Sequence, residues 1–270
     1  MKKNYAVILY GLLILILLVT ACAHAPLKKP DNTIDPSTKE DAPLPIHDKY
    51  KRGQNIPGKL YWAGSAEDKK VALTFDDGPE DHWTPKILEI LKEKNVKATF
   101  FVIGKQAQAY PEMLKKMDAE GHVIGNHTLD HTSLITLDKQ AIAKELEECS
   151  SIIHTITGKT PKLVRPPFGF HNENVDSVVY SKNQFIILWS VDTDDWKGYD
   201  LATVKDRVIP KMKNGYIVLQ HDGVNPHLGG SVEALPEIID ELRKQGYNFV
   251  TIPELLEVPS YEEKDFDRID

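Results

Sequence analysis

Two short segments carry acids and histidines at spacings that could bind a metal ion. Asp76 and Asp77 are adjacent in Thr-Phe-Asp-Asp-Gly-Pro, so one carboxylate could bind a cation while the other stays free as a base, although Asp-Gly-Pro is also ordinary turn sequence. His127 and His131 are four positions apart, so both imidazoles could bind one ion from a single turn or loop. Two imidazoles and a carboxylate leave coordination positions open for water, which predicts a catalytic metal site.

Three further segments carry polar residues that could complete such a site. Arg165 precedes a rigid Pro-Pro step and could orient a carboxylate, although a surface salt bridge is an equal alternative. An acid within 192–195 could hold a histidine in one tautomer, with Trp196 as an apolar wall; the alternative is a solvated acidic loop. His221 follows an apolar run and could be either a third ligand or a general acid.

Strands and helices that could position these residues alternate between about residues 60 and 258. Seven apolar runs predict strands at 71–75, 98–103, 122–125, 162–165, 185–190, 216–220 and 248–252. Amphipathic stretches predict helices that begin at Thr84, as an N-cap before Pro85, at Asp138 and at Ser231; the last two end at Gly158 and Gly246. This alternation predicts a parallel sheet with outer helices, as a barrel or a doubly wound sheet.

The polar candidates all follow predicted strands. Because the carboxyl ends of parallel strands share one face of a β/α fold, we expect these residues to meet there. Loops at that face are polar in any case, but that alone does not explain two acids, three histidines and an arginine together.

Five segments resemble, in order, the five motifs of the polysaccharide deacetylases, the NodB-like domains of carbohydrate esterase family four. They are 74–79, 127–131, 165–169, 192–196 and 217–221. The resemblance covers about residues 60–258 and implies a distorted (β/α) barrel that removes N- or O-acetyl groups from polysaccharides. It also implies one divalent metal ion, with zinc favoured and cobalt, nickel or manganese left open. Both acids of the first motif are present, which favours the ordinary metal-dependent type.

The resemblance also implies a role for each site residue. The metal ligands would be Asp77, His127 and His131. The catalytic residues would be Asp76 as general base, His221 as general acid, Arg165 orienting Asp76, and Asp195 tuning His221. The substrate-binding residues would be Phe168, through its backbone N–H at the oxyanion, and Trp196 and Leu219 around the acetyl methyl group.

Three functions remain open from the sequence. The first is N-deacetylation of N-acetylglucosamine residues in a cell-wall polysaccharide, either peptidoglycan or a chitin-type polymer. The second is O-acetyl ester hydrolysis on a xylan-type polysaccharide. The third is a non-catalytic, cell-wall-binding lipoprotein with a structural metal, although structural zinc sites normally have four protein ligands.

Residues 1–21 have the features of a bacterial lipoprotein signal. Lys2 and Lys3 precede an apolar run over 6–21, which is shorter than the roughly 20 residues of a spanning helix. Small residues before Cys22 resemble a lipobox, whose cysteine is lipidated; an uncleaved anchor helix is the alternative. Both predict a protein held on the outer side of the cell membrane. Residues 22–59 predict a proline-rich linker, and 259–270 an acidic, loose tail.

The composition excludes several classes of protein. Of 270 residues 41% are hydrophobic, too many for a disordered chain, and two cysteines are too few for a disulfide scaffold. A net charge of −7 argues against nucleic-acid binding, and we expect a monomer. Cys149 lies in the apolar stripe of a predicted helix, which favours packing over nucleophilic chemistry.

Overall fold

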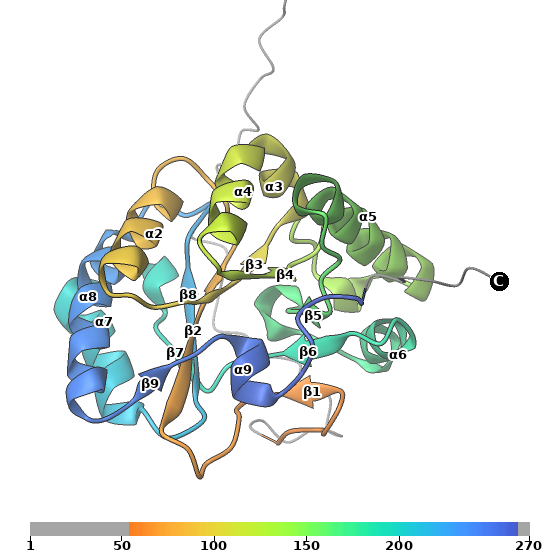
Figure 1. The fold of residues 1–270 in the computed structure, drawn as a ribbon. Coiled ribbons are helices and arrows are strands. Elements are labelled where there is room, and N and C mark those ends of the chain that lie inside the picture. Colours follow the sequence, from red (N-terminus) through yellow and green to blue (C-terminus); the bar gives the residue numbers. More distant parts are fainter. Residues whose placement is uncertain (1–53, 264–270) are drawn as a thin grey trace, which may run out of the picture. The chain divides into compact units, whose positions relative to one another are not determined.

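The computed structural model describes residues 54–263. The predicted signal segment, Cys22 and most of the predicted linker lie outside these residues. Within them, nine strands form one sheet surrounded by helices (Figure 1). The strands are β1 (Leu60–Tyr61), β2 (Lys70–Asp76), β3 (Thr99–Val102), β4 (Val123–Asn126), β5 (Leu163–Val164), β6 (Phe185–Ile187), β7 (Val191–Asp192), β8 (Ile217–His221) and β9 (Asn248–Phe249).

Helices connect most of these strands. The α-helices are α2 (Thr84–Glu93), α3 (Gly104–Ala109), α4 (Pro111–Ala119), α5 (Lys139–Thr157), α6 (Glu173–Ser181), α7 (Leu201–Val208), α8 (Gly229–Lys244) and α9 (Ile252–Leu256). Short 3₁₀ turns are η2 (Leu134–Thr136), η3 (Pro167–Gly169), η4 (Asp195–Lys197) and η5 (Ile209–Lys211).

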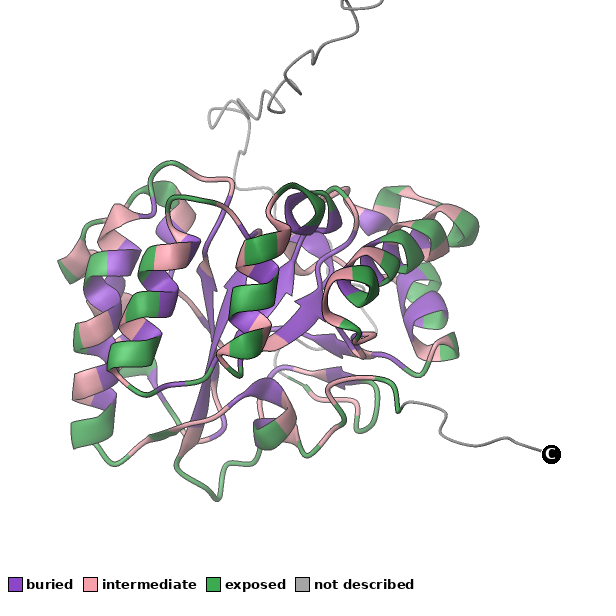
Figure 2. Ribbon diagram, turned by 45° about the horizontal axis from the view of Figure 1, so that its top comes forward, coloured by how far each residue is buried: buried purple, intermediate pink, exposed green. Residues whose placement is uncertain are grey.

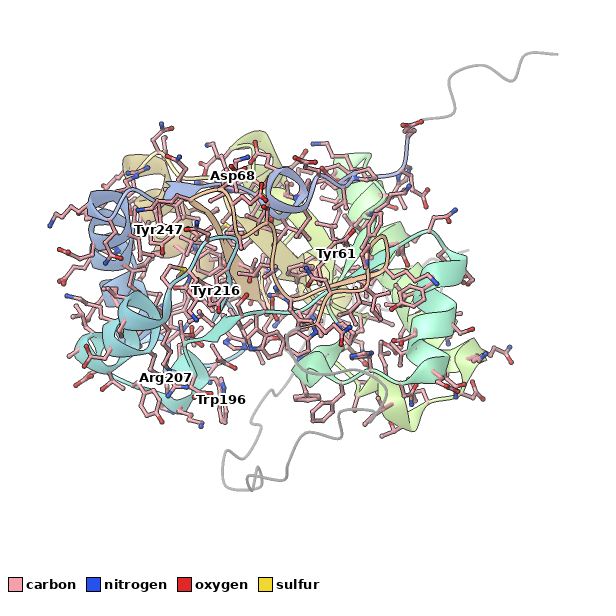
Figure 3. All side chains as sticks on the ribbon, turned by 90° about the horizontal axis from the view of Figure 1, so that it is seen from below. Tyr61, Asp68, Trp196, Arg207, Tyr216 and Tyr247 are labelled. Carbon is pink, nitrogen blue, oxygen red and sulfur yellow. The ribbon has the colours of Figure 1, made fainter. Side chains whose placement is uncertain are left out.

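The sheet curls into a distorted barrel, as predicted. Its strands pair in parallel in the order β1-β6-β5-β4-β3-β2-β8-β7, and β9 pairs with the start of β2. The chain after β1 joins the two edges, because Ala63 bridges Tyr216 and the Ser190 hydroxyl donates to the Trp62 carbonyl at 2.6 Å. Figure 3, seen from below, labels Tyr61 and Tyr216 beside this seam. The prediction of seven strands missed the two-residue strands β1 and β7.

Side chains of β2 alternate between two buried regions. Val71, Leu73 and Phe75 pack with residues of α2 and α8 outside the sheet, whereas Ala72 lies in the barrel interior. The interior cluster consists of Ala72, Phe101, Leu163, Ile187, Ile217, Ile252 and Leu255. The last two come from α9, which closes the barrel where the strands begin. Figure 2 shows the buried strands and the buried inner sides of the helices in purple. The opposite end, where the strands finish, is left to polar residues.

The helix ends match the predictions only in part. The Asp138 carboxylate accepts the Ala141 N–H, and Gly158 ends α5 in the left-handed region, both as predicted. The predicted N-cap at Thr84 is wrong: Trp83 occupies that position, and the Thr84 hydroxyl donates to buried Asp222 instead. Helix α8 begins at Gly229, two residues before the predicted start.

Cys149 packs inside the protein, as predicted. It is fully buried in α5, and its Sγ lies 3.6 Å from the Val102 carbonyl oxygen. Burial raises the pKa of its thiol, so Cys149 is no candidate nucleophile. Among residues 54–263 no helix has the length and apolar character needed to span a bilayer.

The folded domain extends beyond the predicted limits of 60 and 258. Before β1, the Asn55 side chain accepts the Trp62 N–H at 2.7 Å, and Ile56 bridges Leu60. After α9, Tyr261 bridges Pro161, and its hydroxyl accepts the N–H of Ile124 at 2.9 Å. Residues 260–262, at the start of the predicted tail, thus pair with the domain, and a single half-buried tyrosine gives no periodic signal for this.

Candidate active site

The end of β2 supplies two carboxylates to the open end of the barrel. Alternation along the strand points Thr74 and Asp76 inward, and would point Asp77 outward. Asp77 has φ +77°, a left-handed backbone that a residue other than glycine rarely adopts. This conformation returns its carboxylate to the inner side, where Asp77 Oδ1 lies 3.4 Å from Nε2 of both His127 and His131.

The loop after β4 supplies the two histidines. His127 directly follows β4 and is buried, and its Nδ1 contacts the Arg165 carbonyl oxygen at 2.6 Å. That contact fixes the tautomer and leaves Nε2 for a ligand. Thr128 and His131 both have positive φ, which bends the loop so that the second imidazole faces the first. The two ring centroids are 5.0 Å apart.

Asp77, His127 and His131 form a cluster that fits a divalent metal ion. One ligand atom from each lies within 4.8 Å of the others, and no second such cluster occurs in the part of the chain described. Asp77 Oδ1 is buried, and no group in residues 54–263 donates a hydrogen bond to it. A tetrahedral ion with bonds of about 2.0–2.1 Å separates its ligand atoms by about 3.4 Å, as found for Asp77 and each histidine.

Charges within the cluster are arranged to keep its carboxylate ionised. Burial raises the pKa of Asp77. The nearby histidines His131, His127 and His221 lower it by a larger amount, so the net shift of this pKa is downward. Burial lowers the pKa of His127, and the carboxylates of Asp76 and Asp77 outweigh that effect and raise it. An anionic oxygen between two imidazoles is the donor set that zinc and similar ions prefer.

Arg165 holds Asp76 in place. This arginine follows β5, has no exposed surface, and donates through Nη1 to Asp76 Oδ1 at 2.7 Å and to Thr74 Oγ1 at 2.8 Å. Its Nε and Nη2 donate to the carbonyls of Ile187 and Leu188 at 3.1 and 3.2 Å. Because four acceptors surround it, the guanidinium is fixed and orients one oxygen of Asp76. The structure thus brings these two residues together as the sequence motifs implied.

An aspartate–histidine pair faces the site at the end of β8, which pairs with β2 on the side opposite β3. Asp195 Oδ1 lies 2.6 Å from His221 Nδ1, and Asp195 Oδ2 accepts the His221 backbone N–H at 3.0 Å. Burial lowers the pKa of His221, but Asp195, followed by Asp77 and Asp76, raises it to about 10. The pairing with Asp195 therefore favours the protonated imidazole. Since Nδ1 faces Asp195, Nε2 is the atom from which it can donate a proton.

Three predicted substrate-binding residues lie around these groups. The Phe168 ring stands edge-on to His131, with centroids 4.7 Å apart, and Phe168 has φ +62° in η3. Leu219 lies two positions before His221 on β8, on the same inward face, and is 4% exposed. Trp196 follows Asp195 in η4 and is half-buried (Figure 3). Their contacts with an acetyl group remain predictions.

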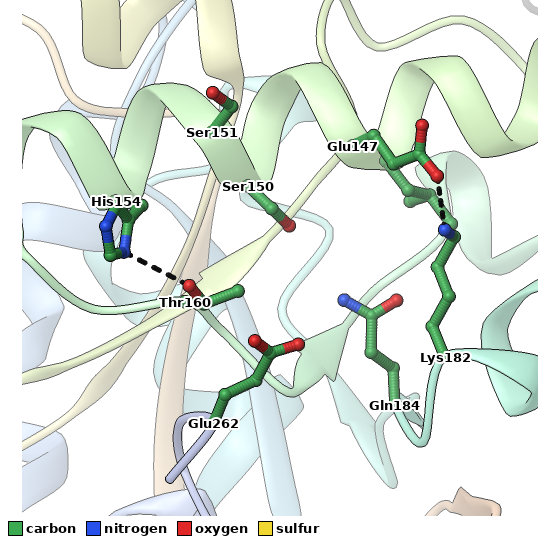
Figure 4. A pocket seen from close by; sticks show the side chains of 9 residues that line it. Glu147, Ser150, Ser151, His154, Thr160, Lys182, Gln184 and Glu262 are labelled. Atoms are coloured by element: carbon green, nitrogen blue, oxygen red, sulfur yellow. Dashed lines mark hydrogen bonds and ion pairs between the residues drawn. The ribbon is translucent and has the colours of Figure 1, made fainter. Parts of the chain in front are cut away.

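Sequence reasoning missed the residue that supports the histidine loop. Asn126 is fully buried, and its Oδ1 accepts the Thr128 N–H at 2.8 Å, while its Nδ2 donates to Leu146 O and Ser150 Oγ. Thr128 Oγ1 in turn accepts the His131 N–H at 3.1 Å. In the sequence this asparagine is only part of a glycosylation-like Asn-His-Thr, and its burial excludes that use. Ser150 also lines a surface pocket, shown in Figure 4 with His154, Thr160, Gln184 and Glu262.

Two further acids lie near the site: Asp192, which belongs to the segment 192–196 identified in the sequence, and Asp222, which the sequence analysis did not single out. Asp192 accepts the Trp189 indole N–H at 3.1 Å and the Asp194 backbone N–H at 2.8 Å, and burial raises its pKa. Asp222 directly follows His221 and has no exposed surface, and burial raises its pKa to about 8.

Comparison of the sequence with known proteins identifies a matching family model and several relatives of this chain. The family model described as polysaccharide deacetylase matches residues 63–184. A peptidoglycan-N-acetylglucosamine deacetylase of Bacillus cereus is 41% identical over 196 residues, which are 73% of this chain and 71% of that protein. The peptidoglycan-N-acetylmuramic acid deacetylase PdaC of Bacillus subtilis is 40% identical over 195 residues, 72% of this chain and 40% of its own length.

A solved structure agrees with the fold. The crystal structure of a peptidoglycan N-acetylglucosamine deacetylase in complex with 4-naphthalen-1-yl-N-oxidanyl-benzamide matches with a TM-score of 0.74 and 40% identity. The match covers 75% of this chain and 95% of that chain.

Proposed function

Because the chain belongs to the polysaccharide deacetylase family, we propose that it hydrolyses N-acetyl groups on N-acetylglucosamine residues of a cell-wall polysaccharide. The observation that carries the proposal is the buried Asp77 oxygen, 3.4 Å from two imidazole nitrogens and beside a second carboxylate, Asp76. Peptidoglycan is the favoured polymer because the relatives described above are named for it.

Asp77, His127 and His131 would hold one divalent ion, for which zinc suits the donor set. When bound, such an ion acts as a Lewis acid, which polarises the amide carbonyl and lowers the pKa of water. Three protein ligands leave room for water and substrate, whereas a structural zinc site is normally closed by four. A purely structural metal is therefore the weaker proposal.

The side chains around the ligands supply the proton transfers. Asp76 Oδ2 lies 3.7 Å from His127 Nε2, so it is beside the position where water would be activated, and it would accept the water proton. Arg165 orients Asp76 through the 2.7 Å bond. His221 would donate from Nε2 to the leaving nitrogen, because an amine is a poor leaving group as an anion. Phe168, through its N–H, would hold the oxyanion, and Trp196 and Leu219 would enclose the methyl group.

A substrate panel tests the proposed function. Acetate release should be measured on chitin oligomers, peptidoglycan and acetylated xylan, with zinc-loaded wild type and with Asp76→Asn as the matched inactive control. We expect release from one or both N-acetylglucosamine polymers, and far less from xylan. Release from xylan alone would establish an O-acetyl esterase instead, and release from none would favour a binding protein.

We also propose that the protein is anchored outside the cell membrane by a lipid on Cys22. The support comes from the sequence, in which basic residues, an apolar run and small residues precede this cysteine. Cys22→Ser should abolish metabolic labelling with a fatty acid, because the lipid needs the thiol. Cys149→Ser is the matched control, since the chain has two cysteines and Cys149 is buried. Wild-type labelling of Cys22→Ser would contradict the proposal.

A further inference from the structure

We propose that Asp222 is a positioning residue that holds the Asp76–Gly78 turn, and with it the metal-binding carboxylate of Asp77. The inference rests on the proposed metal site. Asp222 lies directly after His221, where β8 runs parallel to β2 with Asp76 opposite His221. Its backbone N–H donates to the Asp76 carbonyl oxygen at 3.0 Å, which extends the pairing of the two strands into the site.

The Asp222 carboxylate binds the turn from inside the protein. One oxygen accepts the Gly78 backbone N–H at 3.1 Å, and the other accepts the Thr84 hydroxyl at 2.7 Å. Together with the backbone bond to the Asp76 carbonyl oxygen, the first of these bonds holds the peptides on both sides of Asp77, whose φ is +77°. The second bond ties the carboxylate to the first residue of α2, and so fixes the direction from which it approaches the turn.

The packing leaves this arrangement little freedom. A methyl group on Gly78 would lie 2.1 Å from Asp222 Oδ2, and one on Gly223 would lie 2.8 Å from the Asp77 carbonyl oxygen. The carboxylate and the turn are therefore in direct contact, with no space for water between them. Burying an acidic side chain with no exposed surface is costly unless its oxygens are hydrogen-bonded, as both oxygens of Asp222 are. A fully buried acid bonded to the ligand turn indicates a specific role there.

Loss of Asp222 should act on the metal through Asp77. Without the acceptor, the Gly78 N–H and the Thr84 hydroxyl are buried without their partner, and the left-handed turn at Asp77 loses its support. Relaxation to negative φ would move the Asp77 carboxylate away from the histidines. The same residue also joins the Asp77 turn to His221, so it sets the position of the general acid relative to the metal ligands.

Metal affinity and a cobalt spectrum test this role. Metal-free wild type, Asp222→Ala, Asp222→Asn and Asp176→Ala should be titrated with zinc by calorimetry, and their cobalt-loaded forms compared by visible absorption. We expect Asp222→Ala to lose roughly 10–100-fold in affinity and to show an altered cobalt spectrum. Asp222→Asn keeps an oxygen acceptor for the Gly78 N–H and should recover most of the affinity. Asp176, another buried acid, pairs with His171 away from the turn, so its variant should keep wild-type affinity.

Several outcomes decide against the inference. Wild-type affinity and spectrum in Asp222→Ala, or an equal loss in Asp176→Ala, would overturn it while leaving the metal site intact. A wild type that binds no zinc would overturn the proposed function as well. If Asp222→Ala does not fold, Thr84→Val removes the donor that orients the carboxylate and should lower zinc affinity several-fold. Unchanged affinity and spectrum in Thr84→Val would then contradict the role.

Discussion

His131→Ala is expected to release the metal ion and to abolish acetate release. Asp77 and His127 would remain as the protein ligands, and two ligands do not hold a divalent ion firmly. The loss should exceed the roughly 10–100-fold typical of residues outside the ligand shell. His127→Ala should have the same effect and should also destabilise the fold, because His127 is buried and contacts the Arg165 carbonyl at 2.6 Å. Metal content by mass spectrometry and acetate release by a coupled assay measure both effects.

His154→Ala is the matched control for these variants. His154 is an exposed histidine of α5, bound to Thr160 and distant in the fold from the strand ends that carry the ligands. Its replacement should leave metal content and turnover at the wild-type level. One equivalent of tightly bound metal in His131→Ala would show that the ion is held elsewhere.

Asp76→Asn and His221→Ala are expected to differ in their dependence on the leaving group. Asp76→Asn removes the proton acceptor for water, so turnover should fall roughly 10²–10⁴-fold on both an N-acetylglucosamine amide and an aryl acetate. His221→Ala removes the proton donor, and a phenolate leaves without a proton. Its loss should therefore be large for the amide and small for the aryl ester. Both variants keep the three ligands, so turnover should be compared at equal metal occupancy.

Stability must be measured alongside this comparison. Arg165 has no exposed surface and Asp76 is its carboxylate partner, so Asp76→Asn leaves a buried guanidinium with only neutral acceptors. Removing one partner of a buried ion pair costs about 3–5 kcal/mol. The melting temperature of Asp76→Asn should consequently fall, and assays belong well below it. Equal losses on both substrates in His221→Ala would show that His221 is not the general acid, and loss of metal in that variant would make it a ligand.

The sequence predicts which residues form the site better than it predicts how they are arranged. Asp76, His127, Arg165 and His221 end or follow strands, and parallel strands bring such ends together, so their meeting is predictable. The left-handed backbone of Asp77 is not, because an aspartate normally avoids positive φ and only its tertiary partners hold it there. Without that turn, strand alternation places Asp77 on the wrong side of the sheet.

The supporting residues were hidden for a related reason. Thr84 has every local feature of an N-cap, but a buried acid 138 positions later takes its hydroxyl. Asn126 and Asp222 act through contacts between segments far apart in the chain, which no local pattern encodes. Similarly, β1 and β7 are strands only because neighbouring strands pair with them.

The dependence of catalysis on a bound metal ion can be tested by measuring acetate release by wild-type protein before and after metal removal. The protein should be stripped with a chelator, dialysed, and assayed on an N-acetylglucosamine oligomer while zinc is added back in known amounts. Stripped protein is expected to release no acetate, and activity should return in proportion to the added zinc and reach a plateau at one equivalent per chain. Undiminished acetate release from fully stripped protein, or zinc binding at one equivalent without any acetate release, would contradict metal-dependent catalysis.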